Sequence, residues 1–105
     1  MIEAKSAGGT VLFDGENVTI CRESRIAVSV FGRSEHTIAI RQIGSIAWKP
    51  ATRWSAGHIR FAVPGSQAAA QRVPVNRDEN AILFGRNEQA AFEQLRAAVQ
   101  DALSP

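Results

Sequence analysis

The residues that most often carry out chemistry are few in this sequence, and they stand far apart. Cys21 is the single cysteine, with no CxxC partner and no neighbouring histidine to activate it. It alternates with apolar residues along a predicted strand, which favours a packing role. The two histidines, His36 and His58, are 22 residues apart and lack the cysteine or carboxylate spacing of a structural zinc site. We therefore expect no metal-ligating residues, and we expect His58 on the outer face of a strand.

Motifs for catalysis or cofactor binding are also missing. Residues 32–36 (GRSEH) bring a serine close to a histidine, but in a turn before a strand rather than in a nucleophile elbow. Gly8 and Gly9 precede a strand, whereas a phosphate-binding loop opens a helix. Residues 78–80 (DEN) would suit a divalent cation, yet the apolar run after them favours an acidic turn. We expect no catalytic and no cofactor-binding residues, and we predict that the protein is not an enzyme.

Residues 48–54 (WKPATRW) are the most suggestive segment for function. Two indoles flank two cations across a predicted hairpin, an arrangement that anchors protein partners, stacks on bases or lies at a bilayer interface. The alternative is that the indoles pack in the core, which is favoured for Trp48 and open for Trp54. The residues predicted to bind a partner are Lys49, Arg53, Trp54, His58 and Arg60.

The formal net charge of +2 hides an uneven distribution along the chain. Residues 22–72 contain eight basic residues and two acidic ones, a net charge of +6, and each flank has a net charge of −2. A contiguous basic surface would bind anionic membrane lipid or nucleic acid. The alternative is that the arginines alternate along strands and only solvate the outer face. The sequence leaves open whether these charges form one patch.

Length and composition indicate one small domain that spans residues 1–105, with 45% hydrophobic and 21% charged residues. A single cysteine excludes an internal disulfide framework and fits a reducing compartment. No run approaches the roughly 18 apolar residues of a membrane span. The first residues lack the apolar centre of a signal peptide. The predicted localisation is cytoplasmic.

Alternation of apolar and polar residues predicts seven strands within about residues 10–84. The predicted strands cover residues 10–13, 18–21, 26–30, 38–40, 46–49, 57–63 and 81–84. An Asp14-Gly15 turn joins the first two, and residues 64–79 form the longest connection. From about residue 87 to 103 the apolar spacing becomes that of one helical face, with Asn87 as the predicted N-cap.

Six short segments contain turn glycines, strand apolar residues or part of the helix face. They are residues 9–15 (GTVLFDG), 40–46 (IRQIGSI), 48–51 (WKPA), 57–61 (GHIRF), 78–84 (DENAILF) and 92–96 (FEQLR). Together they resemble a family of bacterial pleckstrin-homology-like (PH-like) domains of unknown function, over about residues 8–103. These motifs are structural, so the resemblance informs the fold more than the activity.

The resemblance implies an α+β, mainly β fold. It would be a seven-stranded antiparallel barrel of two near-orthogonal sheets, capped by one C-terminal amphipathic helix. It transfers no catalytic residue. Eukaryotic PH domains that bind phosphoinositides use basic residues around their first loop, but here residues 14–17 (DGEN) place two carboxylates there, which would repel a phosphorylated head group. We therefore predict a non-enzymatic module for protein–protein interaction or self-assembly; the alternative is binding of anionic lipid or nucleic acid through residues 22–72.

Overall fold

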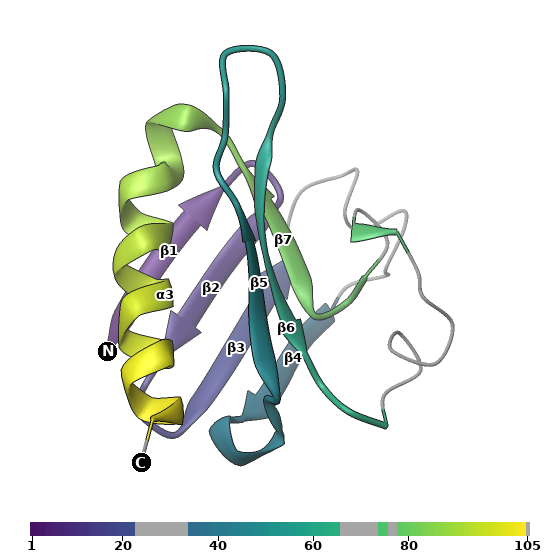
Figure 1. The fold of residues 1–105 in the computed structure, drawn as a ribbon, viewed down its shortest axis with the longest axis vertical. Coiled ribbons are helices and arrows are strands. Elements are labelled where there is room, and N and C mark those ends of the chain that lie inside the picture. The colour runs from purple at the N-terminus through teal and green to yellow at the C-terminus, as the bar shows by residue number, and fades with distance from the viewer. Residues whose placement is uncertain (23–33, 66–73, 76–77, 105) are drawn as a thin grey trace.

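The computed structural model of the chain describes residues 1–22, 34–65, 74–75 and 78–104. Within these residues, seven strands form two antiparallel sheets and a helix follows the last strand (Figure 1). The strands are β1 (Ile2–Ser6), β2 (Gly9–Phe13), β3 (Asn17–Arg22), β4 (Ser34–Ala39), β5 (Ser45–Lys49), β6 (Gly57–Ala62) and β7 (Ala81–Phe84). Two short 3-10 helices, η1 (Ile40–Gln42) and η3 (Arg86–Glu88), precede β5 and the helix α3 (Gln89–Leu103).

The first sheet has the strand order β1-β2-β3-β4. Alternate residues of β2 and β3 are buried, so one face of this sheet lies against the core. The β2–β3 turn has the predicted chemistry: Asp14 Oδ1 accepts the N–H groups of Glu16 at 2.8 Å and Asn17 at 2.7 Å. These hydrogen bonds lower the pKa of Asp14. Gly15 has a φ of 101°, which a residue with a Cβ rarely adopts, so the predicted Asp14-Gly15 turn is confirmed.

The second sheet has the order β5-β6-β7, and its register separates two faces. Trp48 lies opposite Ile59 on the face that packs on the core. Lys49 lies opposite His58, and Ala47 opposite Arg60, on the other face. The alternation of buried and half-buried residues along β6 agrees with this assignment.

Helix α3 covers the core from one side and packs on β1, β2, β6 and η1 (Figure 1). Phe92, Leu95 and Val99 lie on its inner face at three- and four-residue spacing and are completely buried. The Phe84 ring contacts Phe92 at a centroid distance of 4.8 Å and Trp48 at 5.0 Å, which joins the helix to the second sheet. The predicted C-terminal amphipathic helix is confirmed. The predicted N-cap is wrong: Asn87 lies within η3, and the N-cap of α3 is Glu88, which makes no side-chain capping hydrogen bond. The Glu88 carboxylate instead accepts the Gly85 N–H at 2.7 Å at the start of η3.

A mainly β fold of two antiparallel sheets with one C-terminal helix is therefore confirmed, and within the described residues the two sheets do not close into a barrel. Among the described strands, β1 and β4 are the edges of one sheet and β5 and β7 the edges of the other. Where β1 meets β7, the link is a side-chain hydrogen bond from Ser6 Oγ to the Leu83 carbonyl at 2.7 Å. No backbone ladder between described strands continues one sheet into the other.

Two further differences concern the strands. Strand β1 was not predicted, because residues 2–6 contain a single large apolar side chain, Ile2. The predicted strand over residues 26–30 lies outside the described residues, as does most of the predicted loop 64–79. No helix within the described part of the chain has both the length and the apolar character needed to cross a membrane.

Candidate partner-binding site

The loop between β5 and β6, residues 50–56, projects beyond the end of the second sheet (Figure 1). Its tip is held by hydrogen bonds within the loop. The Thr52 N–H donates to the Ser55 carbonyl at 2.8 Å, and Thr52 Oγ1 accepts the N–H groups of Ser55 at 3.0 Å and Trp54 at 3.2 Å. Because these bonds satisfy the tip's own backbone, the loop is ordered without burying its side chains.

The two tryptophans of residues 48–54 have different environments. Trp48 is half-buried, packs on Phe84 and has the Arg96 guanidinium 5.1 Å from its ring centroid. Trp54 is 88% exposed at the loop tip, with the Arg53 guanidinium 5.9 Å from its ring. The favoured packing role of Trp48 is therefore observed, whereas Trp54 makes little contact with the body of the domain. An exposed indole beside a cation is a frequent anchor in protein interfaces.

Lys49 and His58 lie directly opposite each other at the base of this loop, on the outer face of the sheet. Lys49 is exposed and His58 is half-buried. Burial, followed by the positive charges of Arg60 and Lys49, lowers the pKa of His58 below its ordinary value. The structure thus brings four of the five predicted residues to one end of the second sheet: Lys49, Arg53, Trp54 and His58.

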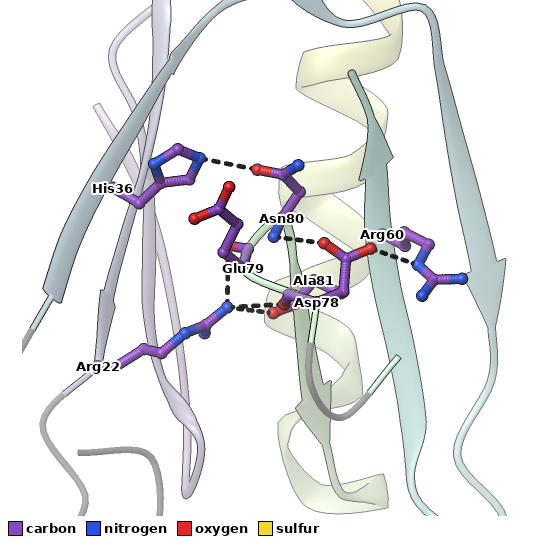
Figure 2. Close-up of polar contacts among 7 residues, drawn as sticks. All are labelled: Arg22, His36, Arg60, Asp78, Glu79, Asn80 and Ala81. Carbon is purple, nitrogen blue, oxygen red and sulfur yellow. Dashed lines mark hydrogen bonds and ion pairs between the residues drawn. The ribbon is translucent and has the colours of Figure 1, made fainter. Parts of the chain in front are cut away.

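The fifth predicted residue, Arg60, has an internal partner. Its Nε donates to Asp78 Oδ2 at 2.7 Å, and the two side chains are 32% and 7% exposed (Figure 2). Arg60 is on the same strand face as His58, but its guanidinium compensates a buried carboxylate. Its prediction as a partner-binding residue therefore concerns a side chain that already has a partner within the domain.

A polar cluster that sequence reasoning missed surrounds this ion pair (Figure 2). Arg22, at the end of β3, is 5% exposed and its Nη2 donates to three main-chain carbonyls. These are the carbonyls of Asp78 at 3.0 Å, Glu79 at 2.9 Å and Ala81 at 2.8 Å. Burial lowers the pKa of Arg22, opposed by the negative charges of Asp78 and Glu79. The cluster therefore connects the first sheet to the turn before β7.

His36 of β4 completes the cluster through a 2.7 Å hydrogen bond between Nε2 and Asn80 Oδ1. The Asn80 N–H in turn donates to Asp78 Oδ1 at 2.8 Å. Both oxygens of the buried Asp78 carboxylate thus have donors, one from Arg60 and one from the backbone. Residues 78–80 form the acidic turn that the sequence favours over a cation site, and its charge is balanced by arginines.

Two arginines of the basic segment 22–72 take part in this polar cluster. Arg22 is buried and Arg60 is paired with Asp78, so neither adds a free cation to the surface. Arg41 is exposed on η1, which precedes the first residue of β5, whereas Arg53 lies in the loop after the last residue of β5. Arg25, Arg33 and Arg72 lie outside the described residues. The described cations of this segment therefore do not form one continuous patch.

Other candidate residues lie apart from the loop. Cys21 is half-buried on β3, opposite Thr10 and Glu35. His36 and His58 lie in different sheets. Within the described residues, no three His, Cys, Asp or Glu side chains lie close enough together to hold a metal ion.

The environment of His58 predicts a pH dependence of stability. Because its folded-state pKa is lower than the value of about 6.5 in the unfolded chain, the unfolded state binds more protons and stability falls as pH drops below about 6.5. An NMR titration of the His58 ring protons should give a pKa below that of a model histidine. Replacing Lys49 with alanine should raise it, because one neighbouring positive charge is lost. A pKa at or above the ordinary value would contradict this assignment.

A family model for a domain of unknown function (DUF4429) matches residues 11–100. The match begins within β2, includes β3 to β7 and most of α3, and therefore contains the whole β5–β6 loop and the polar cluster. Neither a curated protein nor a solved structure matches the chain.

Proposed function

The chain belongs to the DUF4429 family of domains of unknown function, and we propose that it is a non-enzymatic binding domain that docks an acidic protein surface through its β5–β6 loop. The observation that carries this proposal is Trp54, 88% exposed on an internally hydrogen-bonded loop. Arg53 lies beside Trp54 at the tip, and Lys49 and His58 lie at the base of the loop. No acidic residue occurs between residues 49 and 65 to offset the charges of Arg53 and Lys49.

We further propose that the fold is PH-like and that the protein acts in the bacterial cytoplasm. The two antiparallel sheets followed by one C-terminal helix support the PH-like fold that the resemblance implies. The partner is either another protein or a second copy of the chain. A light-scattering mass of the isolated chain over a range of concentrations distinguishes these two cases.

A protein interface suits the loop better than a purely electrostatic one. Its hydrogen-bonded tip presents one aromatic ring in a defined place, and buried aromatic and arginine side chains contribute most of the affinity of protein interfaces. Anionic lipid or nucleic acid would require several convergent cations. Of the described cations in residues 22–72, two have internal roles and Arg41 lies at the other end of β5 from the loop.

The test is capture of partners by the wild-type domain and by two variants, followed by affinity measurement with the purified partner. We expect Trp54→Ala to weaken binding at least about 30-fold, equivalent to about 2 kcal/mol. The matched control is Arg41→Ala, an exposed cation at the far end of the sheet, which should leave the affinity within about threefold. Arg60 is left unchanged because its loss would unpair the buried Asp78. Equal binding by wild type and Trp54→Ala would reject the proposal.

The electrostatic alternative has its own measurement. In a Trp48→Phe background, Trp54 is the sole indole, and its emission reports entry into a bilayer. We expect no blue shift on adding phosphatidylcholine vesicles with or without phosphatidylserine. A blue shift that requires phosphatidylserine and disappears in salt would show that the loop binds anionic membranes, and would reject the protein partner. Capture of nucleic acid alone, lost by orders of magnitude as salt rises, would transfer the function to nucleic-acid binding.

A further inference from the structure

A hydrogen bond to the Gln89 side chain connects the β5–β6 loop to α3. The Ala51 N–H donates to Gln89 Oε1 at 2.8 Å. Gln89 Nε2 donates to Glu93 Oε1 at 3.0 Å, one turn further along the helix. A carboxylate accepts only from the amide nitrogen, so Glu93 fixes which end of the Gln89 amide faces the loop. The oxygen of Gln89 is thereby held where the backbone of the loop can donate to it.

The loop tip does not need this contact to keep its own shape. Thr52 and Ser55 satisfy the tip through their side chains and backbone. These bonds do not determine the direction of the whole tip relative to the domain. That direction depends on the backbone at residues 50–51 and 56–57. The hydrogen bond to Gln89 acts at the first of these two places.

We propose that Gln89 is a positioning residue that fixes the direction in which the β5–β6 loop presents Trp54 and Arg53. This inference rests on the proposed function for its biological use, although the positioning itself is a property of the chain alone. A loop fixed before binding loses little conformational entropy when it docks. It therefore fits a preformed apolar pocket with a carboxylate at its rim, rather than a partner that must fold around it.

Amide hydrogen exchange measured by NMR on the isolated chain tests the positioning role. In Gln89→Ala, exchange of the Ala51 amide should rise about tenfold, the amount expected for one lost hydrogen bond. The order parameter of the Trp54 indole N–H should fall. Exchange of the Ser55 amide should not change, because its acceptor is Thr52 within the tip. The free energy of unfolding should fall by no more than about 1.4 kcal/mol, the equivalent of that tenfold change. A larger loss would indicate general destabilisation of the domain.

Two variants serve as controls. Gln89→Glu keeps an oxygen that can accept from Ala51 but loses the donor to Glu93 and places two carboxylates one turn apart, so the Ala51 amide should recover only part of its protection. Gln94→Ala removes an exposed glutamine from the same helix and should change none of these quantities. The proposal is overturned if Ala51 exchange is the same in Gln89→Ala as in wild type, or if Gln94→Ala has an equal effect.

The outcomes for Gln89 and for the proposed function are separable. Unchanged Ala51 exchange in Gln89→Ala removes the positioning role and leaves the Trp54 binding result as it stands. A Trp54→Ala variant that binds normally removes the proposed function, while increased exchange in Gln89→Ala still establishes that Gln89 orders the loop.

Discussion

Replacing Arg22 with methionine is expected to lower the free energy of unfolding by about 3 kcal/mol or more. Methionine retains an apolar stem of similar length, so the main loss is the guanidinium. Its Nη2 donates to the carbonyls of Asp78, Glu79 and Ala81, and the side chain is 5% exposed. Without it, the acceptors lose a charged donor in a place that water reaches poorly. Urea denaturation of both proteins gives the difference.

The control for this experiment is Arg41→Met, the same substitution at an exposed residue of η1. It should change stability by no more than about 0.5 kcal/mol. A loss in Arg22→Met no greater than the loss in Arg41→Met would show that the polar cluster contributes little to holding the turn before β7 against β3. The same comparison tests whether the positive charge of Arg22, in the basic segment, stabilises the folded state.

The basic residues of this chain fall into two groups, one with contacts inside the fold and one with exposed side chains near the β5–β6 loop. Arg22 and Arg60 stand in the sequence segment with the highest positive charge, yet both act on the turn at residues 78–81. Arg53 and Lys49 have exposed side chains at or beside the β5–β6 loop. Substitutions of the first pair should therefore act on unfolding, and substitutions of the second pair on partner affinity.

Local periodicity predicted the parts of the fold that depend on local pattern. Alternation identified β2, β3 and β6, and the change to helical spacing identified α3. A strand or helix that buries one face has apolar residues at regular spacing along its own sequence, so the pattern is visible locally. Strand β1 was missed since its most buried side chain is the small Ala4, 1% exposed, whose burial depends on pairing with β2. Pairing between distant strands is not a periodic property of either one.

The same limit applies to the candidate site. Trp54, Arg53, Lys49 and His58 stand within ten residues of one another, so a predicted hairpin was enough to place them together. The polar cluster joins residues from β3, β4, β6 and the turn before β7, and Arg22 is 56 residues from Asp78. The ion pair of Arg60 was not predicted for the same reason, because Asp78 lies on another element. Gln89 likewise contacts the loop from 38 residues away.

Gly57 has no room for a side chain, and Gly57→Ala is expected to lower the free energy of unfolding by about 2–3 kcal/mol. A Cβ at this position would lie 2.5 Å from both the Lys49 carbonyl oxygen and the Ala51 nitrogen, and 2.6 Å from Phe84 Cε1. The first two are backbone atoms and the third belongs to a buried ring, so none can move cheaply. Thermal or urea unfolding measures the loss.

The variant should also disturb the base of the β5–β6 loop, because the Ala51 nitrogen that it crowds is the donor to Gln89. We therefore expect faster exchange of the Ala51 amide and a change in Trp48 emission, since Trp48 packs on Phe84. Gly15→Ala is the contrasting control: its φ of 101° makes an added Cβ cost about 1 kcal/mol in backbone strain, but nothing lies within 4 Å of it. Equal losses in the two variants, with Ala51 exchange unchanged in both, would mean that steric crowding at Gly57 does not control the loop.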